Sequence, residues 1–157
     1  AAEAWTCNRH LLEANFDELD PIVAFRMIKG RDIPAEEYLR ICVEMLRLRA
    51  AAATALEGVD AMLVPTTAIA PRSVERLDAS PEAYAEANLA YLRNTAIGNV
   101  LNLCGVSVPC GFTSEGLPIG LMIYAKPYRE DMALRVAHAF EQATDWHQKH
   151  PGLGWLN

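Results

Sequence analysis

The sequence predicts an α/β protein in which helices cover a sheet. Two observations lead to this prediction. Stretches with apolar residues at three-to-four spacing alternate with short, uninterrupted apolar runs, and residues 99–120 are dense in glycine and proline. Glycine permits a positive φ or a close approach of two backbones, and proline fixes φ and removes a hydrogen-bond donor. We interpret 99–120 as a helix end, a buried strand, a tight turn and the entry to a second strand.

Composition limits the classes of function. The chain has 157 residues, 52% of them hydrophobic and 22% charged, which suits one globular domain with a core. Its formal net charge of −6 argues against general nucleic-acid binding, because phosphates would be repelled. No apolar run approaches the roughly 20 residues of a membrane helix, and residues 1–9 lack the pattern of a secretory signal. We therefore expect a soluble protein without nucleic-acid or membrane partners.

Cysteines and histidines indicate neither a disulfide framework nor a metal site. The four cysteines form no CxxC pair; they are Cys7, Cys42, Cys104 and Cys110. Without a signal sequence, free thiols in a reducing cytoplasm are the better interpretation. His147 and His150 lie three residues apart, but no third ligand stands at a recognisable spacing. We expect solvent-facing histidines, no metal and no cofactor.

Start and stop signals place the first helices. Residues 1–19 predict a short helix or an ordered arm, and Asp20-Pro21 predicts a helix that stops at Gly30. A long helix opens with Pro34 at its first position and ends at Gly58. Its predicted buried stripe is Tyr38, Ile41, Met45, Leu48, Ala52 and Leu56.

The second half of the chain contains two further helical regions. Ser80-Pro81 opens a helix that we expect to break at 93–95, with a second segment over 96–104 ended by Gly105. The last helix is predicted from about Arg129 to His147. Its predicted buried residues are Ala133, Val136, Ala137, Phe140 and Trp146.

Three apolar runs predict strands at 59–64, 106–109 and 117–124. The first follows a helix and is apolar throughout, which favours a central parallel strand. The connection over 66–80 leaves its carboxyl end, where α/β proteins bind ligands, although an ordinary surface crossover is the alternative. Three strands are few for this much helix, which indicates that the sheet continues elsewhere.

No catalytic arrangement is visible in the residues themselves. The four serines lie in neither G-x-S-x-G nor S-x-x-K; they are Ser73, Ser80, Ser107 and Ser114. Ser107 alternates with Val106 and Val108 in an apolar strand, so we expect a hydrogen-bonded core hydroxyl. The glycines after Gly111 lack the order and the lysine of a phosphate-binding loop.

Four blocks, in order and at characteristic spacing, resemble the C-terminal part of an amidase-signature-family enzyme. They are Val-Asp-Ala-Met-Leu-Val-Pro-Thr at 59–66, Asn-Leu-Cys-Gly-Val-Ser-Val-Pro-Cys-Gly at 102–111, Gly-Leu-Pro-Ile-Gly-Leu-Met-Ile at 116–123 and Ala-Phe-Glu-Gln-Ala-Thr-Asp-Trp-His at 139–147. The resemblance covers the chain from about Asp20 onward. It implies that residues 1–157 are the C-terminal portion of one amidase domain, with no second domain, in a three-layer α/β/α sandwich with a mixed sheet.

The resemblance also implies an activity and its limits. Such enzymes hydrolyse a C–N amide bond with a serine nucleophile, a bridging serine and a lysine, and the family places these residues in its N-terminal portion. No position here matches them, so no catalytic residue is assigned and the chain alone is expected to be inactive. The implied partners are a small amide substrate in the complete enzyme, and either the N-terminal portion or a second copy. The alternative is a stand-alone, non-catalytic module that binds a small ligand or a partner chain.

Two segments are candidates for the walls of the substrate pocket. They are the loop after Pro65, with Thr66, Thr67 and Ile69, and the predicted helix break at Asn94 and Thr95. Glutamine-using members, the tRNA-dependent amidotransferase subunits, tend to carry an acid at the position that resembles Thr95. A threonine there favours a general amidase.

Overall fold

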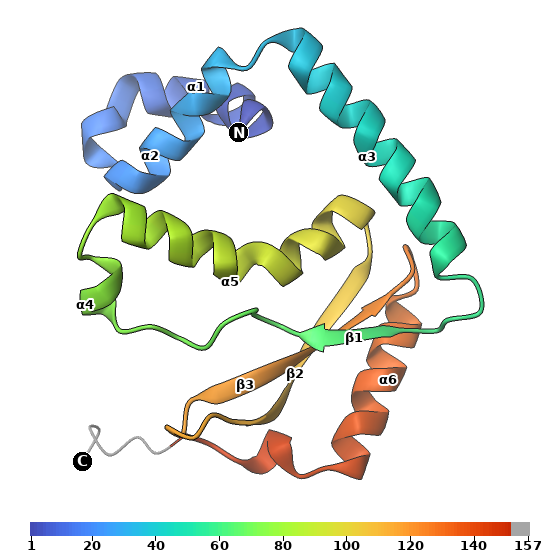
Figure 1. The fold of residues 1–157 in the computed structure, drawn as a ribbon. Helices are drawn as coiled ribbons and strands as arrows, with labels where there is room; N and C mark the ends of the chain where they lie inside the picture. The colour runs from blue at the N-terminus through green and yellow to red at the C-terminus, as the bar shows by residue number, and fades with distance from the viewer. Residues whose placement is uncertain (152–157) are drawn as a thin grey trace. The chain divides into compact units, whose positions relative to one another are not determined.

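The computed structural model describes residues 1–151, which fall into two compact units that divide after Arg47 (Figure 1). The first unit contains α1 (Ala2–Asn15), α2 (Pro21–Ile28) and the start of α3 (Ala35–Ala55), with 3-10 turns at Phe16–Glu18 and Lys29–Asp32. The Asp20 carboxylate accepts hydrogen bonds from the N–H groups of Ile22 and Val23, both at 3.0 Å. The predicted start of α2 is therefore confirmed, because an aspartate cap precedes a proline at the first helical position.

Helix α3 corrects the predicted buried stripe. It begins one residue after Pro34, and Gly58 follows its end with φ +74°. None of its residues is buried, and Ile41 is 40% exposed. Amphipathic periodicity identifies the face that a helix can bury, but it does not say whether the same chain supplies the covering surface.

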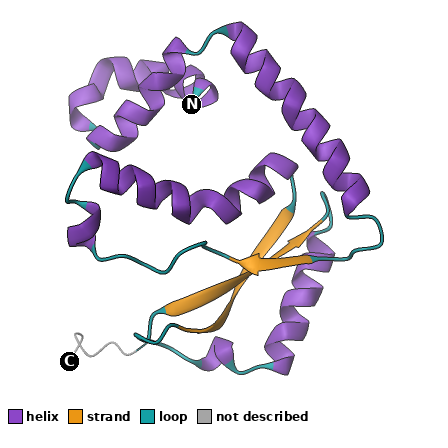
Figure 2. Cartoon of the chain, in the orientation of Figure 1, coloured by secondary structure: helices purple, strands orange, loops and turns teal. Residues whose placement is uncertain are grey.

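The second unit is built on a three-stranded antiparallel sheet (Figure 2). Its order is β1 (Met62–Pro65), β3 (Pro118–Ala125) and β2 (Cys104–Phe112). Leu63 and Val106 pair with Ile123 from opposite sides. The predicted parallel placement of 59–64 is wrong for this chain, because β1 is an edge strand that pairs antiparallel with β3. An apolar run indicates burial but not the direction of a neighbour.

Two helices cover the two faces of this sheet. Helix α6 (Glu130–Ala143) packs on one face, where Val108, Ile123 and Ala137 form a buried cluster. Helix α5 (Pro81–Leu101) packs on the other, where Gly98 lies directly against the Tyr124 ring. The predicted layering of helix, sheet and helix is thus confirmed as a partial α/β fold.

Several boundaries differ from the sequence prediction. Helix α5 runs unbroken through 93–95 and ends at Asn102, a left-handed cap with φ 58°, so Gly105 lies inside β2. Helix α6 ends at Ala143, and Trp146 instead begins a 3-10 turn, where its ring meets Phe112 edge-on with centroids 6.3 Å apart. The 66–80 connection includes a short helix, α4 (Val74–Leu77). No helix within residues 1–151 has the length and apolar character needed to cross a bilayer.

Candidate functional site

The end of β1 meets the middle of α5 through Asn94. The Asn94 side-chain amide donates to the Pro65 carbonyl oxygen at 2.7 Å, and the Asn94 side chain accepts from Arg93 Nε at 3.3 Å. Asn94 is only 6% exposed, so these bonds satisfy a buried polar group. The helix was predicted to break at Asn94, but it does not. The Asn94 side chain hydrogen-bonds to β1 instead of competing for the backbone groups of its own helix.

Thr66, the first residue after β1, is held at two points. Its N–H donates to the Gly120 carbonyl at 2.8 Å, and its Oγ1 lies 2.5 Å from Ser107 Oγ on β2. A Cβ on Gly120 would lie 2.7 Å from Thr66 Oγ1 and 2.8 Å from Ser107 Oγ, so the glycine leaves the space in which the two hydroxyls meet. The structure thus joins two segments that are 41 residues apart in sequence.

Ser107 is a residue that sequence reasoning misjudged. The strand alternation was correct, but Ser107 lies on the face opposite Val106 and Val108 and is exposed. Helix α5 covers this face at Tyr124 and not at Ser107. The signal that could have indicated this contact is Gly120, near the start of the neighbouring strand β3. A glycine inside a strand often marks a place where other groups approach closely.

The remaining candidates bond within their own segments. Thr67 Oγ1 donates to the Ile69 carbonyl at 3.0 Å, which closes the loop after β1. Thr95 Oγ1 donates to the Leu92 carbonyl at 3.1 Å inside α5. The Tyr91 hydroxyl accepts from the Arg72 N–H at 2.7 Å and so ties the far end of the loop to α5. The structure brings Thr66 and Asn94 to the end of β1 but gives the side chains of Thr67 and Thr95 no partner outside their own segments within residues 1–151.

The groups gathered here are suited to binding and not to proton transfer. Within residues 1–151, no lysine, histidine or carboxylate bonds to the side chains of Thr66, Asn94 or Ser107. Burial raises the pKa of the Cys110 thiol, which favours its protonated form. The site offers hydroxyls, an amide and carbonyls, but neither an activated nucleophile nor a base.

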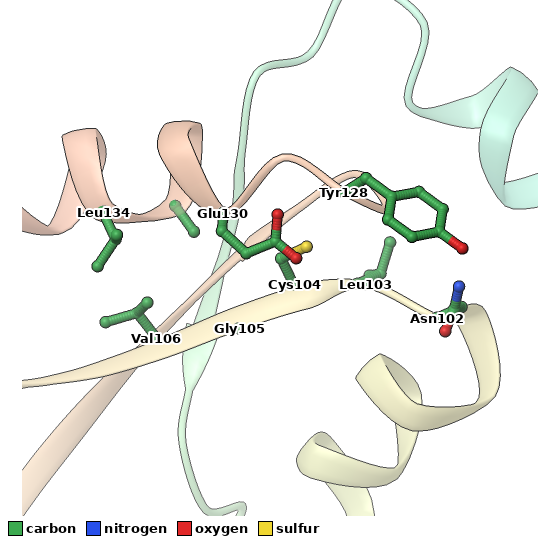
Figure 3. A pocket seen from close by; sticks show the side chains of 9 residues that line it. Asn102, Leu103, Cys104, Gly105, Val106, Tyr128, Glu130 and Leu134 are labelled. Carbon is green, nitrogen blue, oxygen red and sulfur yellow. The ribbon is translucent and has the colours of Figure 1, made fainter.

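A separate cavity of about 370 Å³ lies between β2 and α6 and contains none of the predicted site residues (Figure 3). Its walls include Cys104 and Gly105 of β2 and Glu130 and Leu134 of α6. Figure 3 shows the Glu130 side chain on α6 and the Cys104 side chain on β2, which both line this cavity. Neither Thr66 nor Ser107 lines this cavity.

The described residues, 1–151, contain no group of three or more histidines, cysteines or carboxylates placed to hold a metal ion. His147 and His150 are both exposed, and only His147 lies in a helical turn.

Fold and sequence together define the class of protein. The family model "Amidase" matches residues 6–134. The chain belongs to the amidase family. An amidase of Pseudomonas putida is 33% identical over 153 residues, which are 96% of this chain and 33% of that protein. A glutamyl-tRNA(Gln) amidotransferase component of Desulfatibacillum aliphaticivorans is 41% identical over 101 residues, 63% of this chain and 20% of that protein.

Solved structures support the same fold. A crystal structure of an amidase superposes with a TM-score of 0.78 at 20% identity, over 90% of this chain and 33% of that chain. At that identity the likeness shows the fold alone. The chain thus spans between a fifth and a third of the length of the curated relatives described above.

Proposed function

We propose that this chain is the C-terminal portion of an amidase that hydrolyses the C–N bond of a small amide. In this mechanism a serine attacks the carbonyl carbon, the C–N bond breaks to release ammonia or an amine, and water then cleaves the resulting ester. A second serine and a lysine move the protons. These three residues belong to the part of the enzyme outside this sequence, and the chain alone is inactive.

The observation that carries this proposal is the polar wall at the end of β1. Thr66 and Asn94 are fixed there by bonds of 2.8 and 2.7 Å to backbone carbonyls, yet no base is bonded to either side chain within residues 1–151. A wall of fixed polar groups without a nucleophile fits one half of a pocket. We infer that Thr66, Thr67, Ile69, Asn94 and Thr95 line the substrate pocket of the complete enzyme.

The substrate is a general amide and not glutamine held by its α-ammonium group. An α-ammonium group is best bound by a carboxylate. Glutamine-using members of the family tend to carry an acid at the position that resembles Thr95. Here that position is a threonine, whose hydroxyl bonds within its own helix. We infer a reducing, cytoplasmic location from four cysteines without pair spacing.

The partner of this chain is the remaining portion of the amidase fold or a second copy. The outer edge of β2 supports this proposal. The Gly120 carbonyl on β3 points toward β1, so Gly120 makes no backbone hydrogen bond to Pro109, its partner on β2. The backbone polar groups of Pro109 therefore point away from β3, and those of Gly105 and Ser107, at alternate positions of the same strand, point the same way. Their N–H and C=O groups are available to another strand, except at Pro109, which has no N–H.

A chimera tests the proposal. The third of the Pseudomonas putida amidase that matches this chain is replaced by this sequence, and ammonia release from propionamide and from glutamine is measured. We expect release from propionamide that serine-directed phosphonates abolish, weaker release from glutamine, and none from the isolated chain. A chimera that melts cooperatively but releases no ammonia from either amide would contradict the proposed function.

A further inference from the structure

We propose that the hydroxyls of Ser107 and Thr66 form a subsite that binds the carboxamide group of the substrate. This inference rests on the proposed function and deepens it, because it adds Ser107 to the pocket and gives the pair a ligand. It begins from a contact between two hydroxyls, Ser107 Oγ on β2 and Thr66 Oγ1 just after β1, at 2.5 Å.

The pair lies where a ligand can reach it. Ser107 is exposed and Thr66 is half-buried, and both belong to the sheet face that α6 does not cover. A hydroxyl pair with a purely structural role is expected to be covered by a neighbouring side chain. The β3 residue that lies next to both hydroxyls is Gly120, which has no side chain to cover them. The two hydroxyls meet in the space that a side chain on Gly120 would take, so no side chain at this strand position separates them from a ligand.

The position of the hydroxyl pair agrees with a binding role. Thr66 immediately follows β1 and begins the connection over 66–80, and connections of that length often carry function. The Thr66 N–H is bonded to the Gly120 carbonyl, and the adjacent Pro65 carbonyl is bonded to Asn94. Both neighbouring backbone groups are therefore already satisfied, and the hydroxyls are the groups left to meet a ligand.

The chemistry of two bonded hydroxyls selects one class of ligand. Each hydroxyl has one proton and two lone pairs, so when one donates to the other, the second keeps a free proton and the first keeps a free lone pair. The pair therefore presents one donor beside one acceptor. A primary carboxamide presents the complementary set, a carbonyl acceptor and an N–H donor on the same carbon. A carboxylate offers only acceptors and an ammonium only donors, so each leaves one side of the pair unmatched.

Binding by the isolated chain tests the inference without requiring catalysis. Amide resonances of the ¹⁵N-labelled chain are followed by NMR during titration with propionamide to high millimolar concentration, and with propionate as the matched ligand control. We expect the resonances of Thr66, Ser107 and Gly120 to shift with propionamide and to shift several-fold less with propionate. Equal shifts with both ligands, or no shifts at these three positions, would overturn the proposal.

Two variants and a control locate the binding groups. Ser107→Ala removes one hydroxyl, and Gly120→Ala places a Cβ within 2.8 Å of both hydroxyls and so forces them apart. Both variants should abolish the propionamide shifts at Thr66. Ser114→Ala alters an exposed serine in the turn between β2 and β3 and should leave them unchanged. Folding of each variant is checked by its NMR spectrum. Shifts that persist in a folded Ser107→Ala chain would overturn the proposal even if Gly120→Ala fails to fold.

The chimera separates this inference from the proposed function. There, Ser107→Ala should raise KM for propionamide about fivefold, the size expected for one lost neutral hydrogen bond, with a smaller change in kcat, and Ser107→Thr should restore it in part. An active chimera with an unchanged KM in Ser107→Ala overturns the subsite and leaves the amidase function intact. An inactive chimera contradicts the proposed function, and the NMR titration still decides the subsite.

Discussion

The side-chain amide of Asn94 donates to the Pro65 carbonyl at 2.7 Å, while its main-chain carbonyl accepts from the Tyr124 hydroxyl at 3.0 Å. One residue of α5 thus bonds to both β1 and β3. The Thr66 N–H points toward β3, so the preceding Pro65 carbonyl points to the outer side of β1. Asn94 occupies the position at which a neighbouring strand would otherwise pair with Pro65.

Replacing Asn94 with leucine should destabilise the chain by about 2 kcal/mol, because the Pro65 carbonyl loses its partner in a partly buried hydrogen bond. Urea unfolding of the isolated chain measures this change. Thr95→Ala, which removes a bond within one helix, is the control and should cost less than about 0.5 kcal/mol. Equal destabilisation by the two variants would show that the link between α5 and β1 contributes nothing.

Gly98→Ala should also destabilise, because its new Cβ would lie 2.8 Å from the Tyr124 hydroxyl oxygen and closer still to the ring. We expect a loss of about 2 kcal/mol from overpacking, although alanine favours helices by about 1 kcal/mol over glycine. Asn99→Ala, at an exposed neighbouring position, is the control. Combining Gly98→Ala with Tyr124→Ala should cost less than the sum of the two, whereas strict additivity would contradict the contact.

Alkaline pH should weaken the fold through Tyr124. Burial raises the pKa of this phenol above its ordinary value of 10.0, against a smaller opposing effect from the Gly98 backbone. The stability from keeping it neutral is therefore complete below pH 10 and is lost as pH rises through the higher folded-state pKa.

The comparison that isolates this effect is Tyr124→Phe. The free energy of unfolding of the unaltered chain should fall more steeply between pH 9 and pH 11 than that of the variant, while other tyrosines, including Tyr38 with a pKa of about 12, contribute equally to both. Parallel curves would mean that Tyr124 ionises as freely in the folded chain as in the unfolded one.

The isolated chain should self-associate if it lacks its proper partner. Leu63 on the edge strand β1 is 54% exposed, and edge strands with apolar side chains pair with other chains. Sedimentation should give a mass that rises with concentration, and Leu63→Lys should reduce this rise. Val74→Lys, on the short helix α4, is the matched control. A monomer at every concentration would favour the stand-alone module.

Local signals in the sequence predicted local structure well. Asp20 and Ser80 each precede a proline and cap the helices predicted to start there; Ser80 Oγ accepts from the Ala83 N–H at 3.1 Å. The family resemblance followed from the order and spacing of four motif blocks, and the family model that matches residues 6–134 confirms it.

Relations between distant segments were not predictable from the same signals. The apolar run in β1 predicted a central, buried strand, whereas β1 is an antiparallel edge strand without a buried residue. The periodicity of α3 predicted which face the helix could bury but not what would cover that face. Ser107 was predicted to be a hydrogen-bonded core hydroxyl; it is hydrogen-bonded to Thr66, but it is exposed. The meeting of Asn94 with Pro65 depends on the path of α5, which no local pattern encodes.

The most direct measurement of the central claim is ammonia release from propionamide, compared between the isolated chain and the same chain joined to the remaining two thirds of the Pseudomonas putida amidase. We expect no release from the isolated chain and phosphonate-sensitive release from the joined protein. Phosphonate-sensitive release by the isolated chain, or none from a folded joined protein, would contradict it.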